Sequence, residues 1–190
     1  MQRKLFLKFG IAIGSFLTAP FYLNARPGSG PRNDKGFKVD AGKDRFNKSS
    51  SPDNGVIFYT KISTKDTDGD MCAFESTLIK EGGPVFHTHY KTDEFWYVLQ
   101  GEFIFKVGDT IYNAKAGDLI FGPRNLPHTF AKLGQGEAKL LICYQPAGKM
   151  EDYFRKINEE VYRNMSQEEK DNFGKEHGIE RVGPPLTYSK

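Results

Sequence analysis

The residues best suited to chemistry lie in one short stretch, HTHYKTDEFWYVLQGE, at residues 87–102. The chain has only four histidines, and this stretch places His87 and His89 two residues apart, with Glu94 five residues after the second. Side chains two residues apart on a β-strand point to the same face. His128, in GPRNLPHTF, brings a third imidazole at the start of another apolar run. Three imidazoles and one carboxylate suit one divalent transition metal ion: Fe, Mn, Ni, Cu or Zn.

Four protein ligands leave one or two positions open on an ion that accepts five or six. An open position is typical of a catalytic metal site rather than of a closed structural one. The alternative is that each residue is separately structural: a strand edge, a surface carboxylate and a core histidine. Because three of the four histidines fall at these positions, we favour the metal site. The fourth, His177 in KEHGIE, is expected to be a solvated or cap-associated residue near a helix end.

Strands must position these residues, and residues 56–148 predict one strand after another, with Gly- and Asp-containing turns between them. No helical periodicity interrupts this block, so the sequence predicts an all-β domain, an antiparallel sandwich or barrel. The expected strands are VIFYTKIS, CAFESTLIK, PVFHTH, EFWYVLQGEFIFKVG, TIYNAKAGDLIFG, HTFAKLG and AKLLICYQ.

The alternation of side chains along these strands predicts the surroundings of the ligands. If Glu94 points inward, so does Trp96, and Phe130 follows His128 in the same way. Trp96 and Phe130 are therefore predicted to line a substrate cavity with apolar, aromatic walls, which suits a flat small molecule better than a sugar or a polyanion. The alternative is that such side chains fill the core.

The regions on either side of the β-domain differ in composition. Residues 26–55 are polar, with GFKV as a candidate edge strand. Residues 149–190 are expected to form two short helices and a tail. MEDYFRKINEEVYRNM has apolar residues at helical spacing, and SQEEKDNFGKEHG begins with a capping box at Ser166 and Glu169.

Residues 1–25 have the pattern of an export signal: MQRK is a positive start, an apolar stretch follows, and Ala25 offers a small residue for cleavage. RKLFLK is similar to a twin-arginine signal with Lys in place of the second Arg. We expect an exported, periplasmic protein; an uncleaved N-terminal anchor is the alternative. No later stretch is apolar enough to span a membrane.

The charge distribution excludes a nucleic-acid partner. The formal net charge of +3 is supplied by Arg3, Lys4 and Lys8, so the rest of the chain sums to zero and has no basic stripe to follow phosphates. The two cysteines, Cys72 and Cys143, both fall in expected strands. They either pair as a disulfide in an oxidising compartment or remain buried free thiols.

The candidate metal site resembles the first motif of the cupin family, in which His-x-His is followed by Glu and then by Gly. His87, His89, Glu94 and Gly101 fit this spacing, although the leading glycines lie closer than usual. By this resemblance, the four ligand positions are all filled.

The second cupin motif is similar to residues 117–132. Gly117, Pro123 and His128 match it, whereas Asn125 replaces a Gly and Lys132 replaces the final Asn. Asn tolerates the left-handed backbone that a Gly position implies, and neither replacement touches a ligand. The resemblance implies the cupin double-stranded β-helix, a jelly-roll barrel.

Residues 36–155 are similar to the single-domain cupins described as quercetin dioxygenase-like. The resemblance implies a metal-dependent dioxygenase-type oxidoreductase that acts on a small enol, phenol or flavonoid-like molecule, with Glu94 as the catalytic base. A non-catalytic metal or small-ligand binding cupin and a zinc or manganese cupin isomerase are the alternatives, because cupins share a fold more than a reaction. Small cupins also commonly pair through sheet faces, so a homodimer is a further expectation.

Overall fold

The computed structural model of the protein describes residues 32–49, 55–157 and 159–187. The predicted export signal, residues 1–25, lies outside them. Within the described ranges, no helix combines the length and the apolar character needed to cross a membrane.

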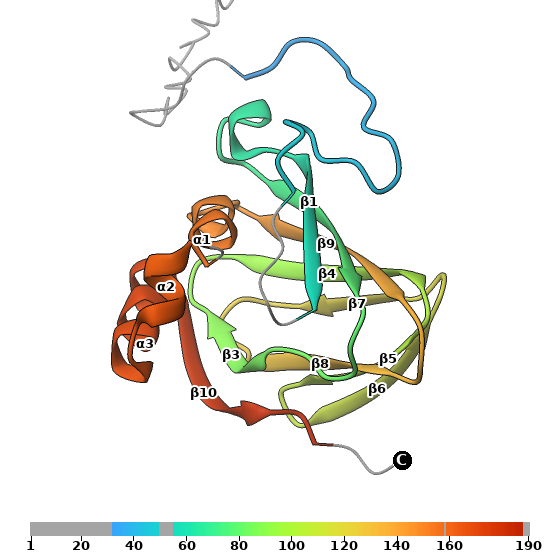
Figure 1. Cartoon of the computed structure of the whole chain (residues 1–190), viewed down its shortest axis with the longest axis vertical. Helices are drawn as coiled ribbons and strands as arrows, with labels where there is room; N and C mark the ends of the chain where they lie inside the picture. The colour runs from blue at the N-terminus through green and yellow to red at the C-terminus, as the bar shows by residue number, and fades with distance from the viewer. Residues whose placement is uncertain (1–31, 50–54, 158, 188–190) are drawn as a thin grey trace, which may run out of the picture.

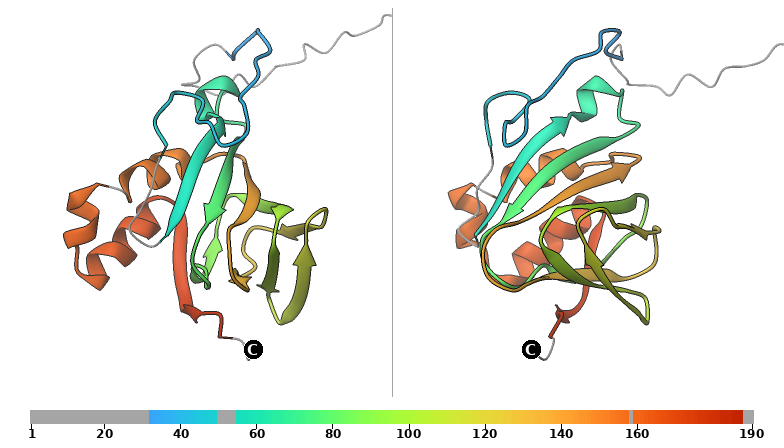
Figure 2. Two further views of the ribbon diagram at one scale, coloured as in Figure 1. Left: turned by 45° about the vertical axis from the view of Figure 1, so that its right-hand side comes forward. Right: turned by 90° about the vertical axis from the view of Figure 1, so that its right-hand side faces the viewer.

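Two antiparallel sheets face each other, and the helices lie together at one side of them (Figures 1 and 2). The strand order is β1-β2-β9-β4-β7 in the first sheet and β10-β3-β8-β5-β6 in the second. This is the predicted jelly-roll arrangement. The strands are β1 (Val56–Ile62), β2 (Cys72–Leu78), β3 (Val85–His89), β4 (Asp93–Gln100), β5 (Glu102–Val107), β6 (Thr110–Lys115), β7 (Leu119–Gly122), β8 (His128–Leu133), β9 (Ala138–Gln145) and β10 (Ile179–Pro185).

The core lies between the sheets because inward residues alternate with outward ones. On β4, Glu94, Trp96 and Val98 are buried, whereas Tyr97 and Leu99 are exposed. Two of the expected runs are each divided into two strands by a tight turn. Between β4 and β5 the turning residue is Gly101, whose φ is +84°, and a Cβ there would lie 2.6 Å from the side chain of Ala138. Only glycine satisfies both conditions.

Strand β10 forms in the C-terminal region, where the sequence predicted only a tail after the second helix. It pairs antiparallel with β3, so Ile179 lies opposite His89, and its register shifts on both sides of Gly183. The sequence IERVGPP contains two prolines, which cannot donate hydrogen bonds to a neighbouring strand and are tolerated at a sheet edge. The edge position of β10 in the strand order therefore explains why a strand forms without a recognisable strand pattern.

The C-terminal region forms three helices, α1 (Met150–Lys156), α2 (Glu160–Asn164) and α3 (Gln167–Glu176), where two were expected. The single helix expected over residues 150–165 is divided, and Val161 is 68% exposed instead of lying on a buried face. The break directs Tyr162 against Phe173 of α3, with ring centroids 5.3 Å apart. The predicted capping box is confirmed: Glu169 N donates to Ser166 Oγ, and Ser166 N donates to Glu169 Oε2.

The fourth histidine, His177, lies at the C-cap of α3 and is cap-associated, as predicted, although it is buried rather than solvated. Its Nδ1 lies 2.8 Å from the carbonyl oxygen of Phe173, and its Nε2 lies 3.1 Å from Asp152 Oδ2 on α1. The imidazole also packs on the Phe173 ring at 4.2 Å between centroids. His177 therefore joins α3 to α1.

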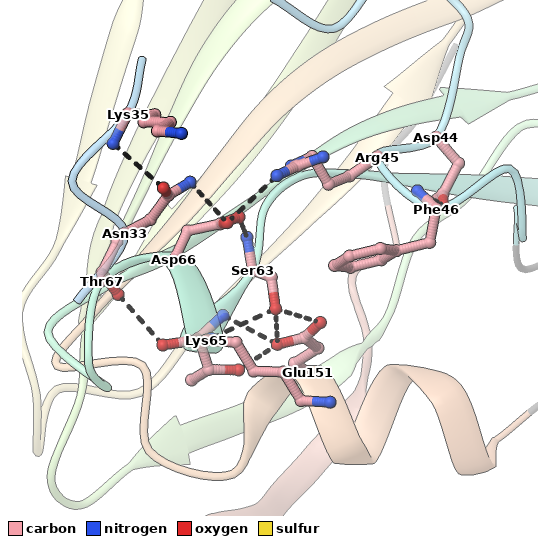
Figure 3. Close-up of polar contacts among 11 residues, drawn as sticks. Asn33, Lys35, Asp44, Arg45, Phe46, Ser63, Lys65, Asp66, Thr67 and Glu151 are labelled. Carbon is pink, nitrogen blue, oxygen red and sulfur yellow. Dashed lines mark hydrogen bonds and ion pairs between the residues drawn. The ribbon is translucent and has the colours of Figure 1, made fainter. Parts of the chain in front are cut away.

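A half-buried carboxylate fixes α1 to the connection between β1 and β2. Glu151 accepts hydrogen bonds from Ser63 Oγ at 2.8 Å, from Thr64 N at 2.8 Å and from Thr64 Oγ1. Figure 3 shows Glu151 reaching from α1 to Ser63, which begins the short 3₁₀ helix η1 (Thr64–Asp66). Because Ser63 is completely buried, this attachment holds the start of α1 against the sheets.

The candidate edge strand GFKV, at residues 36–39, is not a strand in the structure. The side chain of Asp44 accepts the backbone N–H of Thr60 at 2.7 Å, and Arg45 N donates to Thr60 O at 2.8 Å. A local turn therefore satisfies the backbone of β1 where an added strand would pair. Arg45 also approaches Asp66, which fixes this segment to η1 (Figure 3).

The two cysteines are free and buried. Cys72 lies opposite Tyr144 in the β2–β9 pair, and Cys143 lies opposite Ala73. Since neighbouring residues on a strand point to opposite faces, the two thiols lie on opposite faces of the sheet. The alternative of free thiols therefore holds. Burial raises the pKa of Cys143 to about 12, which keeps the thiol protonated.

Candidate metal centre

The four predicted ligands converge from three strands. His87 and His89 lie on β3, Glu94 on β4 and His128 on β8, and one ligand atom from each lies within 4.8 Å of the others. Glu94 Oε2 is 3.0 Å from His89 Nε2 and 3.2 Å from His128 Nε2. His87 and His128 face each other across the β3–β8 pair. Residues separated by up to 41 positions in the sequence thus meet between the two sheets.

Backbone carbonyls orient two of the imidazoles. His87 Nδ1 lies 2.8 Å from Val85 O, and His128 Nδ1 lies 2.9 Å from Leu126 O. A neutral imidazole that donates from Nδ1 has its lone pair on Nε2, so these contacts select the tautomer that binds a metal through Nε2. The loop before β8 is itself fixed, because Asn125 N donates to His89 O at 2.8 Å. Asn125 has a φ of +64°, which confirms that Asn replaces Gly in a left-handed position.

Four buried atoms of this cluster have no hydrogen-bond partners. Both ring nitrogens of His89, Nε2 of His128 and Oε2 of Glu94 are all unpaired in this sense. Buried polar atoms without partners are unfavourable unless something binds them. Separations of 3.0 and 3.2 Å are close to the ~3 Å expected between two atoms that each bind one ion at about 2.1 Å. The three histidines and the glutamate thus fit a single metal ion.

The protonation states also suit a metal. Burial would raise the pKa of Glu94, but the imidazoles of His128 and His89 outweigh it and hold the pKa well below the ordinary value. Burial lowers the pKa of His87 to about 4, although the Glu94 carboxylate opposes the shift. At neutral pH the carboxylate is ionised and His87 is neutral, which are the forms that bind metal ions.

A cavity of about 540 Å³ extends from the cluster between the sheets and the helices. His87, His89 and Glu94 are among the residues that line it. The rest of the wall is mainly apolar and aromatic, and it comes from β1, β2, β8, β9, β10, the loop before β3, and from α1 and α2 as well. The aromatic residues in the wall are Phe58, Phe130, Tyr144, Tyr153, Phe154 and Tyr162.

The two residues predicted for the cavity wall have different places. Phe130 lines the cavity, whereas Trp96 is not among the lining residues. Trp96 lies behind His128, with ring centroids 5.1 Å apart, and it is fully buried. Gly122 makes room for this packing, because a Cβ there would lie 2.8 Å from the Trp96 ring and 3.1 Å from His128 Nδ1. Trp96 therefore supports a ligand from the core side.

Tyr144 is a site residue that sequence reasoning missed. It lies directly opposite Glu94 in the β4–β9 pair, lines the cavity and is 3% exposed. Burial and the neighbouring Glu94 carboxylate raise the pKa of Tyr144 well above its ordinary value, so the phenol keeps its proton. The inward parity of AKLLICYQ could have placed Tyr144 in the interior. Its position next to Glu94 follows only from the pairing of β9 with β4.

Part of the chain is similar to known proteins. The family model described as "Cupin domain" matches residues 74–144. An uncharacterized protein of Methanocaldococcus jannaschii is 31% identical over 68 residues, which are 36% of this chain and 54% of that protein. The chain thus spans about half the length of the curated relative that it matches.

Several solved structures are also similar. An RmlC-like cupin from Shewanella frigidimarina has 18% identity and a TM-score of 0.49, with 65% of this chain and 99% of that chain covered. KdgF from Halomonas sp. has 17% identity and a TM-score of 0.46, with 52% and 86% covered. A predicted oxalate decarboxylase from Thermotoga maritima has 21% identity and a TM-score of 0.45, with 47% and 79% covered.

Similarity at this level says nothing about the substrate or the reaction. The matched residues 74–144 nevertheless include every one of the four candidate ligands, and the two facing sheets have the expected topology. Residues 74–144 match the cupin domain, and the chain has the cupin fold.

Proposed function

We propose that this protein is a metal-dependent enzyme, a dioxygenase-type oxidoreductase that acts on a small enol, phenol or flavonoid-like molecule. The observation that supports it is the set of unpaired buried ligand atoms beside a cavity with aromatic walls. A purely structural core would not leave such atoms without partners. A cavity with apolar walls and a few converging polar groups is the usual form of a small-molecule site.

His87, His89, Glu94 and His128 would hold the ion. A bound divalent ion supplies Lewis acidity toward an enol or phenol oxygen and, if it is redox-active, a route for electrons to dioxygen. The chain's own residues perform the remaining tasks. Phe130, Tyr144 and Phe154 lie in the cavity wall, where they can bind a flat ring and exclude water.

Glu94 is the residue best placed to move a proton. Its carboxylate is ionised at neutral pH and lines the cavity, so it can accept the hydroxyl proton of an enol or phenol. Removing that proton makes the substrate electron-rich before it reacts. Tyr144, opposite Glu94, keeps its proton and can position the carboxylate.

The test is the Glu94→Gln substitution, which keeps the shape and one oxygen ligand but removes the base. We expect metal to remain at least partly bound while turnover falls by about 10²-fold or more, the range typical of lost proton transfer. Metal is measured by elemental analysis, and turnover by oxygen uptake with a panel of enols, phenols and flavonols. Equal turnover by Glu94→Gln and the parent would exclude the proton-transfer role. If no metal supports oxygen uptake, an isomerase or a binding protein becomes the better interpretation.

A further inference from the structure

The hydroxyl of Ser76 is a buried polar group in the cavity wall that the metal centre does not use. Ser76 lies on β2, is 1% exposed and lines the cavity. Its Oγ has no hydrogen-bond partner. A hydroxyl that is removed from water and left unpaired destabilises the ligand-free protein, so a partner supplied by a bound molecule would be favourable.

Few of the unpaired buried side-chain atoms in the described ranges face the cavity. The residues with such atoms are Arg45, Ser76, Thr88, His89, Glu94, Trp96 and His128. Of these residues only Ser76, His89 and Glu94 line the cavity. His89 and Glu94 are candidate metal ligands, which leaves the hydroxyl of Ser76 as a separate unpaired group in the same wall.

The strand register places Ser76 far from the metal centre. Ser76 lies opposite Leu140 of β9, and Leu140 lies opposite Val98 of β4, so Ser76 is in the row of Val98 and not in that of Glu94. The two rows are four residues apart, or about 13 Å, and β2 and β4 are two strands apart, or about 10 Å. Ile142, which lies on β9 between the two rows, is apolar and lines the cavity.

We propose that Ser76 binds the polar end of an elongated substrate whose other end is bound at the metal centre. This inference rests on the proposed function of the same cavity and narrows its substrate class. A single ring cannot reach both ends. The expected molecule is flat and mostly apolar, has two or three rings, and carries a metal-binding oxygen pair at one end and an uncharged oxygen at the other.

The chemistry of the far end favours an uncharged group. A serine hydroxyl both donates and accepts hydrogen bonds, so it can bind a hydroxyl or a carbonyl oxygen. A carboxylate or phosphate there would require a buried cation to compensate its desolvation. The charged lining residues apart from the candidate ligands are Lys80 and Glu81, and both are exposed to solvent.

Two probes that differ by one hydroxyl test the inference. The first is 2-(biphenyl-4-yl)-3-hydroxy-4-pyranone, which carries a hydroxyl-keto pair on one terminal ring, and the second, dihydroxy probe adds a 4′-hydroxyl on the opposite terminal ring. Their affinities for the metal-loaded protein are measured by fluorescence titration without oxygen, so that no turnover occurs. We expect the parent to prefer the dihydroxy probe by about 5-fold, the value of one net hydrogen bond. Ser76→Ala should abolish the preference by weakening the dihydroxy probe alone.

Thr77→Val is the matched control. Thr77 is the next residue on β2 and is also buried, but it points to the opposite face of the sheet. This variant should keep both the affinities and the preference of the parent. A preference lost in Thr77→Val as well would attribute the effect to a disturbed strand and overturn the inference.

The metal-free protein gives a second, independent measurement. Because Ser76→Ala removes an unpaired buried hydroxyl, its unfolding midpoint should rise by about 2 to 4 °C. A lower midpoint would mean that the hydroxyl is paired within the protein, which contradicts the premise.

The remaining outcomes separate this inference from the proposed function. Equal affinity of the parent for both probes overturns the role of Ser76 and leaves the metal-dependent function intact. Equal affinity of the metal-loaded and metal-free parent for either probe contradicts the proposed function, because the metal then takes no part in binding. If the metal-loaded parent binds neither probe, both are overturned.

Discussion

The chain uses histidine beside a carboxylate in two places, with opposite results. At the metal centre, His89 Nε2 lies 3.0 Å from Glu94 Oε2. At the contact between α1 and α3, which we call the helix joint (Asp152 and His177), His177 Nε2 lies 3.1 Å from Asp152 Oδ2. The residue types and the distances are nearly the same. The hydrogen bonds around the two pairs differ.

In the helix joint the partners are supplied by the protein. His177 Nδ1 has the carbonyl of Phe173, and Asp152 also pairs with Arg155 at 2.6 Å and Lys156 at 2.7 Å. At the metal centre, both nitrogens of His89 and Oε2 of Glu94 lack hydrogen-bond partners. A histidine close to a carboxylate is therefore no indication of function by itself. The unpaired atoms distinguish a pair that awaits a ligand from a pair that joins two helices.

The largest expected difference between the two pairs is in metal content. Alanine at His89 or at His128 removes one of four ligands and should reduce bound metal well below one ion per chain. His177→Ala, the matched control, should keep the metal content of the parent. Elemental analysis of the purified proteins measures both. One metal ion per chain in both the His89 and the His128 variants would contradict the assignment of the ligands.

The stability of the metal-free protein should change in the opposite sense. His177→Met loses the contacts to Asp152 and Phe173, so we expect the free energy of unfolding to fall by about 1–2 kcal/mol. The nitrogens of the His89 imidazole are unpaired, and His89→Met puts a flexible apolar side chain in its place. The free energy of unfolding should therefore stay the same or rise by about 1 kcal/mol. Urea unfolding of the metal-free proteins measures both changes. An equal loss in the two variants would remove the distinction between the pairs.

The smallest effect concerns the pH dependence of stability at the helix joint. Lys156, with Arg155 and His177, holds the pKa of Asp152 well below its ordinary value. A lowered pKa in the folded state contributes stability above the ordinary value of about 4 and loses it as the pH falls further. The difference in stability between the parent and Asp152→Asn should therefore be full above about pH 5 and shrink below about pH 4.

The size of that difference is limited because the Asp152 side chain is 40% exposed. Screening by solvent reduces the contribution to roughly 0.5–1 kcal/mol. Thermal unfolding of the two proteins as a function of pH measures it, and the metal content at neutral pH serves as the control. A difference that grows toward low pH would reverse the sign of the argument.

Much of the site could be predicted because its residues form local patterns. His87 and His89 are two residues apart on one strand, so their side chains must share a face. His177 lies outside any such pattern. Parity also predicted that Trp96 points inward. Whether an inward residue meets a cavity or a filled core depends on what the opposite sheet places there, and Trp96 meets His128 and Phe130. That information is not in the strand itself.

The remaining features depend on partners distant in the sequence. Tyr144 neighbours Glu94 because β9 pairs with β4, and strand order is not readable from strand composition. β10 forms because β3 offers an open edge, not because IERVGPP has a strand pattern. The break between α1 and α2 depends on the rings of Tyr162 and Phe173. The export signal and the homodimer stay predictions.

The cavity wall has one consequence for how such proteins diverge. Met150, Tyr153, Phe154 and Ile157 line the cavity, yet they lie beyond residue 144, where the match to the cupin domain ends. The candidate metal ligands and this part of the cavity wall are thus encoded in separate stretches of the gene. Exchange of the C-terminal stretch alone could give a descendant a new ligand while it inherits the same metal chemistry. Among proteins descended from this chain, sequence similarity within the cupin domain should therefore predict the bound metal better than the substrate.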